Sequence, residues 1–239
     1  MANKFLILIA CAAVFILAFV FLSGHRETRL TSDEWEESYA SFSPDGNSIS
    51  FTSNTDGNLD IWLINLSTRE YKQLTWDASS DWHPSWSPDG KLMAFCSIDP
   101  SAGNGSAIWI LNISTGEKYQ LTRGTSFDRA PAFSPDGKRL AFHSGSGIDD
   151  LWMIGIDGKN LTQITSSETS EWGVTWSPDG KMIAFSAGMN ETNNIWTMEL
   201  STGKRHQITS GGNDWRPSWS PDGRQIVFHR DGDIWVVDV

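Results

Sequence analysis

Hydrophobic positions divide the chain into two parts. Residues 5–22 form an unbroken apolar run of 18 residues, which is close to the shortest helix that can span a bilayer. After residue 30, apolar positions occur in short alternating or fully apolar runs between clusters of turn-forming residues. This pattern is typical of β-strands, and no stretch there has the periodicity of a helix. The sequence therefore predicts an all-β domain that follows one N-terminal hydrophobic segment.

The β-rich part repeats itself. The tetrapeptide Ser-Pro-Asp-Gly occurs five times, starting at Ser43, Ser87, Ser134, Ser177 and Ser220, with spacings of 44, 47, 43 and 43 residues. Proline presets the second position of a turn, and glycine accepts the left-handed conformation that ends it. Each copy is predicted to close a tight β-hairpin, and the period indicates a repeat architecture.

Each repeat can be divided into four strands. In the second repeat they are residues 84–87, 91–97, 107–112 and 118–122. A phenylalanine ends the second strand of every repeat, at Phe51, Phe95, Phe142, Phe185 and Phe228, and a tryptophan recurs in the third, at Trp62, Trp109, Trp152, Trp196 and Trp235. Four strands at this period predict a β-propeller blade. The recurring aromatic residues are expected to fill the space between blades.

The two ends of the repeat array complement each other. The last repeat stops after its third strand, at Val239, whereas Thr28-Arg29-Leu30-Thr31 resembles a fourth strand that has no blade of its own. Pairing the two would remove open sheet edges. The sequence thus predicts a five-bladed β-propeller of four-stranded blades over residues 28–239, closed by the N-terminal strand. One N-terminal transmembrane or signal helix, within residues 1–24, precedes it.

The N-terminal segment has two interpretations. Its apolar run is longer than that of most secretory signals, which favours an uncleaved membrane anchor at residues 5–22; a signal cleaved near Gly24 is the alternative. Five Asn-x-Ser/Thr sequons, from Asn65 to Asn190, favour an extracytoplasmic domain. We therefore expect a cell-membrane protein with a single-pass N-terminal anchor and an extracytoplasmic propeller, or else a secreted or periplasmic protein.

Charge and cysteine content narrow the range of partners. The net charge is −11, which argues against nucleic acid and anionic lipid surfaces as partners. The two cysteines, Cys11 and Cys96, lie in the apolar run and in a predicted strand. No disulfide and no metal site is predicted from them. We expect no cofactor.

The repeat also resembles a known family. The patterns Pro-x-Trp-Ser-Pro-Asp-Gly-Lys, Ala-Phe, Asp-Ile-Trp and Gln-Leu-Thr are similar to the WD40-like repeat of TolB-type propellers, over nearly all of residues 28–239. The resemblance implies a scaffold for protein–protein interaction in the cell envelope. TolB carries an α/β domain ahead of its propeller, where this chain has its apolar segment.

Candidate binding residues lie in the loops that join one repeat to the next. Six positions before the serine of each Ser-Pro-Asp-Gly turn, every repeat has an acid: Glu37, Asp81, Asp128, Glu171 and Asp214. The next position holds Ser38, Trp82, Arg129, Trp172 and Trp215. We expect a ring of carboxylates with three indoles near the channel mouth, suited to a cation or to a basic, aromatic-seeking partner. Alternatively, each acid caps turn amides in its own or the next blade.

Two functions follow from these patterns. The first is a membrane-anchored or exported scaffold that binds another protein or a surface polymer. The second is an extracytoplasmic glycan lyase or hydrolase that uses channel carboxylates. No Gly-x-Ser-x-Gly elbow, His-Glu-x-x-His motif or phosphate-binding glycine loop occurs, so we assign no catalytic residue and expect a protein that is not an enzyme.

Overall fold

The computed structural model describes residues 29–31, 36–55, 57–99, 105–189 and 192–239. The chain divides into two compact units, Met1–Glu34 and Trp35–Val239, and every described strand belongs to the second. Among the described residues, no helix is long and apolar enough to cross a membrane. The apolar run at residues 5–22 lies outside them, so the anchor and the signal peptide remain predictions.

The second unit consists of five antiparallel sheets, which we call blades 1 to 5 in chain order. Blade 1 contains β1 (Glu37–Phe42), β2 (Ser48–Ser53), β3 (Asp60–Asn65) and β4 (Tyr71–Gln73). Blade 2 contains β5 (Ser80–Trp86), β6 (Leu92–Ile98), β7 (Ala107–Asn112) and β8 (Lys118–Gln120). Blade 3 contains β9 (Phe127–Phe133), β10 (Arg139–Gly145), β11 (Asp150–Gly155) and β12 (Thr162–Gln163). Blade 4 contains β13 (Ser170–Trp176), β14 (Met182–Met189), β15 (Thr192–Glu199) and β16 (Arg205–Gln207), and blade 5 contains β17 (Asp214–Trp219), β18 (Gln225–Arg230) and β19 (Asp233–Asp238).

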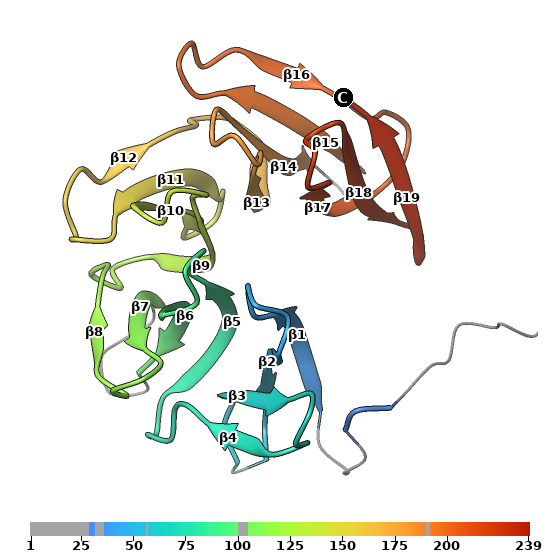
Figure 1. The fold of residues 1–239 in the computed structure, drawn as a ribbon. Helices are drawn as coiled ribbons and strands as arrows, with labels where there is room; N and C mark the ends of the chain where they lie inside the picture. The colour runs from blue at the N-terminus through green and yellow to red at the C-terminus, as the bar shows by residue number, and fades with distance from the viewer. Residues whose placement is uncertain (1–28, 32–35, 56, 100–104, 190–191) are drawn as a thin grey trace, which may run out of the picture. The chain divides into compact units, whose positions relative to one another are not determined.

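The blades follow one another around a common centre. Their first strands, β1, β5, β9, β13 and β17, lie innermost, and the fourth strands lie outermost (Figure 1). This arrangement confirms the predicted five-bladed propeller. It also confirms that the last repeat ends after its third strand.

The Ser-Pro-Asp-Gly turns join the first and second strands, as predicted. In the first copy, the Gly46 amide donates to the Ser43 carbonyl at 2.9 Å, and the Ser43 hydroxyl donates to the Asp45 carboxylate at 2.5 Å. The other four copies repeat both bonds. Every glycine of the set has φ between 69° and 71°, a left-handed conformation that glycine adopts without strain.

Hydrophobic clusters fill the junctions between neighbouring blades. The described residues form four of them, at the 1–2, 2–3, 3–4 and 4–5 junctions. The second-strand phenylalanines are at most 5% exposed, which confirms their place in the core. The third-strand tryptophans of blades 1 to 4 are only partly buried, and Trp235 of blade 5 is exposed.

Successive turns also pack on one another. A Cβ added to Gly90 would lie 3.7 Å from Pro44 of the preceding turn, and Gly137, Gly180 and Gly223 have the same relation to Pro88, Pro135 and Pro178, at 3.5 or 3.6 Å. Gly46 of the first turn would meet nothing within 4 Å. The junction between blades 5 and 1 therefore lacks this contact.

Blade 5 presents an uncovered sheet. It has three strands among the described residues, and in β19 Ile234, Trp235 and Val236 are 46–63% exposed. The residues equivalent to Ile234 in the other blades, Ile61, Ile108, Leu151 and Ile195, are fully buried. Closure of blade 5 by Leu30 and Thr31 remains a prediction.

Candidate functional site

The five predicted acids begin the innermost strands, but they do not form an exposed ring. Asp81, Glu171 and Asp214 are 0% exposed and Asp128 is 7% exposed, while Glu37 is partly buried. The backbone explains this burial, because the amides of these strands bond to the preceding blade; for example, the Asp81 amide donates to the Leu59 carbonyl at 2.7 Å. The expectation of carboxylates open to the channel mouth is therefore wrong for these four residues.

The acids of blades 4 and 5 pair with side chains and not with turn amides. Arg230 binds Asp214 through two hydrogen bonds of 2.6 and 2.8 Å. Arg205 donates to Glu171 at 2.5 Å. Both guanidinium groups also cover the aromatic residues of their own blade: Arg230 lies 5.2 and 4.9 Å from the rings of Phe228 and Trp235, and Arg205 lies 5.0 and 5.5 Å from those of Phe185 and Trp196.

Among the described residues, no guanidinium pairs with the acids of blades 2 and 3. Asp128 accepts a hydrogen bond of 2.5 Å from the Ser144 hydroxyl, and burial raises its pKa. Asp81 makes no hydrogen bond of ordinary geometry through its carboxylate, although the Ser97 hydroxyl and the Lys118 charge lie close enough to favour its ionised form. Burial dominates, and it raises the pKa of Asp81 to about 6.

The predicted residues that follow the acids come together in part. The rings of Trp172 and Trp215 lie 5.1 Å apart. Trp172 donates from Nε1 to Asp149 at 2.8 Å, and Arg129 lies 3.8 Å from the same carboxylate. Trp82 packs instead against the cluster between blades 2 and 3.

Sequence reasoning missed a second group of residues, which sits one position further along each first strand. There, Tyr39, His83, Ala130 and Arg216 have φ between 48° and 56°, and Gly173 has φ of 63°. A β-bulge in each first strand accounts for these angles. The Tyr39 and His83 rings lie 3.9 Å apart, and the Arg216 guanidinium lies 5.3 Å from the Tyr39 ring.

Trp215 and Arg216 are consecutive residues of β17, so the Trp172–Trp215 and Arg216–Tyr39 contacts adjoin and the two groups form one surface. We call Tyr39, Arg129, Trp172, Trp215 and Arg216 the inner-strand patch. Its cations keep access to solvent, since the Arg129 side chain is 34% exposed and Arg216 is exposed. The nearby His83 is neutral at pH 7, because burial and the neighbouring His143 and Arg216 lower its pKa to about 3. The patch therefore combines guanidinium groups with indole faces.

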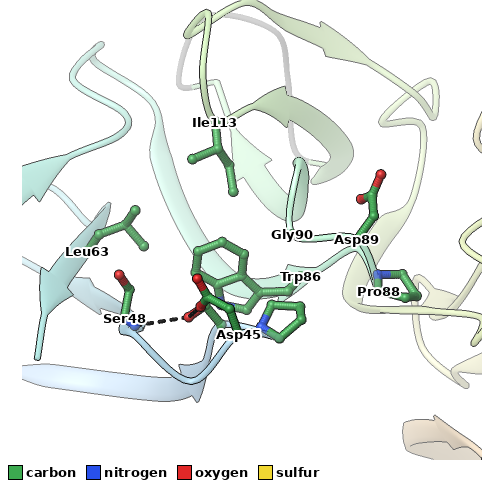
Figure 2. Close-up of a pocket in the computed structure, with 10 residues that line it drawn as sticks. Asp45, Ser48, Leu63, Trp86, Pro88, Asp89, Gly90 and Ile113 are labelled. Atoms are coloured by element: carbon green, nitrogen blue, oxygen red, sulfur yellow. Dashed lines mark hydrogen bonds between the residues drawn. The ribbon is translucent and has the colours of Figure 1, made fainter.

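A cavity lies on the opposite side of the blades, between the first two Ser-Pro-Asp-Gly turns. It has a volume of about 490 Å³, and Figure 2 shows Trp86 between Leu63 and the two turns. The Asp45 and Asp89 carboxylates accept hydrogen bonds from their own turns, which lower their pKa values. Both carboxylates are thus hydrogen-bonded within their own turns. In the described part of the chain, no three His, Cys, Asp or Glu residues are placed to hold a metal ion.

Known proteins share this architecture. The structure of TolB from Acinetobacter baumannii superimposes with a TM-score of 0.76 at 23% identity, over 90% of this chain and 57% of that one. TolB from Agrobacterium tumefaciens, reported as putative, gives 0.68 at 25% identity, over 84% and 73%. An uncharacterized protein of Agrobacterium fabrum is 34% identical over 73 residues, which are 30% of this chain and 25% of that protein. The chain thus spans just over half of the first TolB structure.

A family model settles the relationship. The model of PD40, the TolB beta propeller domain, matches residues 17–101 and 100–237, which together include all five Ser-Pro-Asp-Gly turns. The chain therefore belongs to the TolB β-propeller domain family.

Proposed function

We propose that this protein is an exported or membrane-anchored propeller of the cell envelope that binds another protein or a surface polymer through the inner-strand patch. The observation that supports this most is the neighbouring placement of Trp172, Trp215 and Arg216 on innermost strands. Tryptophan and arginine supply much of the energy of protein interfaces. A rigid propeller holds such side chains in fixed positions, which lowers the entropy cost of binding.

The charges of the site favour an acidic partner over a basic one. Four of the five predicted acids are buried, and two of them are neutralised by Arg205 and Arg230. The accessible charges of the inner-strand patch are the guanidinium groups of Arg129 and Arg216. We therefore propose a partner that places carboxylates and aromatic or apolar groups against the patch, in place of the basic ligand that the sequence suggests.

Affinity capture with matched variants tests this proposal. The immobilised protein is exposed to solubilised envelope proteins and polymers, and the captured species is titrated against wild type, Trp215→Ala, Arg216→Ala and Trp76→Ala. Trp76 is 69% exposed and lies outside the patch, so its variant is the control. We expect the two patch variants to lose more than about tenfold in affinity. Equal binding by all four proteins would contradict the role of the patch.

A glycan lyase or hydrolase has less support. The enzyme suggested by the sequence would act on its substrate through the five predicted acids as channel carboxylates. The described structure buries four of them inside the blades.

The envelope location depends on residues 5–22 and is tested separately. Membrane and soluble fractions are separated after export, and the membranes are washed at alkaline pH. Retention of the full-length chain supports the anchor. Release of a chain shortened near Gly24 supports the secreted or periplasmic alternative.

A further inference from the structure

Four of the five blades place a side chain of their own against one or both rings of their recurring Phe–Trp pair. Blades 4 and 5 use Arg205 and Arg230, each of which also pairs with the buried acid. Blade 2 uses Lys118, whose ammonium lies 5.4 Å from the Trp109 ring. In blade 1, the Tyr71 ring lies 6.3 Å from that of Phe51. A cation over the rings and beside the acid is therefore the commonest arrangement in this propeller.

Blade 3 has the acid and the rings but no cation at either position that supplies one elsewhere. Arg205 stands four residues before Thr209, and the residue four before Thr165 in blade 3 is Leu161. Likewise, Arg230 stands two residues after Phe228, and Ser144 stands two after Phe142. Among the described residues, no cation forms an ion pair with Asp128.

A cavity occupies this place in blade 3. Its volume is about 380 Å³, and its lining includes Asp128, Phe142, Ser144, Trp152 and Leu161. It lies between the loop that follows β8 and the sheet of blade 3. Leu161 is 55% exposed and does not fill it. A cavity of this size is within the range of small-ligand sites.

We propose that this blade 3 pocket binds a guanidinium group on an aliphatic stem, with Asp128 as its counter-ion and Phe142 and Trp152 as its stacking surfaces. Such a group occurs in free arginine-like compounds and in an arginine side chain of a partner. The guanidinium groups of blades 4 and 5 show that the same acid, Phe and Trp positions accommodate this shape. The pocket lies outside the inner-strand patch, so the proposal does not depend on the proposed function.

Physical chemistry favours a guanidinium over other ligands here. Its flat face stacks on aromatic rings, and its fork of N–H groups matches a carboxylate. Burial disfavours the charge on Asp128 and raises its pKa, and a cation in the pocket would offset that cost. A neutral ligand would leave the carboxylate without a counter-charge, and an anion would be repelled.

One residue of the chain could compete for the pocket. Arg123 lines it, is exposed, and forms no ion pair or cation–π contact with the described residues. The variant Arg123→Ala therefore belongs in the test. Binding that appears only in this variant would show that Arg123 fills the pocket of the native protein, and that result would overturn the proposal.

The test uses the full chain and N-acetyl-arginine methylamide as the probe, titrated by calorimetry. N-acetyl-citrulline methylamide, which has nearly the same shape without the charge, is the control ligand. We expect the arginine probe to saturate the wild-type protein and the citrulline probe to bind at least about tenfold more weakly, as expected for loss of a charge-assisted hydrogen bond. A pentapeptide with a central arginine distinguishes the sources, since tighter binding than that of free arginine points to a partner side chain.

Two variants locate the binding. Leu161→Arg supplies the internal cation found in blade 4, so it should abolish binding while the fold is retained, because position 161 is exposed. Asp128→Asn should weaken binding by at least about tenfold. No saturation in the wild type, equal binding of both probes, or unchanged binding by Leu161→Arg would each overturn the proposal.

Discussion

The Arg216 guanidinium lies 5.3 Å from the Tyr39 ring, and this contact joins the last blade to the first. At the other junctions, the inner strands approach more closely; a Cβ on Gly173 would lie 3.6 Å from the Arg216 Cα of the next blade. The junction between blades 5 and 1 also lacks the proline–glycine contact of the turns. Long side chains therefore contribute more to this junction than to the others.

Removing the Tyr39 ring should weaken that junction. We expect Tyr39→Ala to lower the free energy of unfolding by about 1 kcal/mol, from loss of the cation–π contact and of the contact with His83. Tyr39→Phe keeps an aromatic face and should stay close to wild type. Urea denaturation of both variants provides the measurement. Equal stability of the two variants would show that the ring contributes nothing.

Closure by the N-terminal strand makes a prediction about register. In the other four blades, the threonine two residues after the fourth strand accepts a hydrogen bond from a third-strand amide, as Thr75 does from Ile61 at 2.9 Å. The same register would place Thr28 opposite Val236, as Lys72 is opposite Leu63. We therefore expect Thr28→Cys with Val236→Cys to form a disulfide under mild oxidation.

The control for this cross-link is a pair two residues out of register, Thr28→Cys with Ile234→Cys. It should remain reduced, and non-reducing gel mobility distinguishes the two outcomes. Equal cross-linking of both pairs would indicate chance collision. Absence of a cross-link in either pair would argue against closure by this strand.

Asp81 should make stability depend on pH with an unusual sign. Its folded pKa of about 6 exceeds the ordinary value of 3.8, so the folded state holds the proton more tightly than the unfolded state does. The stability that this provides is present below about pH 4 and is lost as the pH rises through about 6. The free energy of unfolding of Asp81→Asn, relative to that of the wild type, should thus increase by up to about 3 kcal/mol between pH 4 and pH 7.

A turn carboxylate gives the comparison of opposite sign. The Ser87 hydroxyl and the Lys91 amide lower the pKa of Asp89, so its contribution is lost as the pH falls. The free energy of unfolding of Asp89→Asn should therefore lie furthest below that of the wild type near neutral pH. Urea denaturation of both variants from pH 4 to pH 7 tests the pair. A pH-independent effect of Asp81→Asn would contradict the raised pKa.

The Arg230–Asp214 ion pair should contribute far more to the free energy of unfolding than an ion pair on the surface does. Asp214 is fully buried, and Arg230→Ala would leave its carboxylate without a counter-charge. We expect a loss of about 3 kcal/mol in the free energy of unfolding. The exposed pair of Lys181 and Asp179 is the control, and Lys181→Ala should cost less than about 1 kcal/mol. Similar losses for both variants would mean that solvent reaches Asp214.

The sequence indicated the repeat well and the binding surface poorly, for a physical reason. The turns and the second-strand phenylalanines depend on local chemistry, so the spacing of Ser-Pro-Asp-Gly was enough to place them. The counter-charges of the buried Glu171 and Asp214 come from other strands, 34 and 16 residues away, and these partners follow no shared spacing. The bulges that turn Tyr39 and Arg216 toward one another leave no signal in residue type, because only Gly173 among the five bulge residues is a glycine.

The stacked turns have a consequence for how such a protein can change its size. The four described joints repeat the same proline–glycine contact, so part of the fit between neighbouring modules lies within the repeated tetrapeptide itself. A duplicated module would carry both halves of that contact. Growth or loss of whole modules should therefore be easier in evolution, and in engineering, than alteration of any single joint.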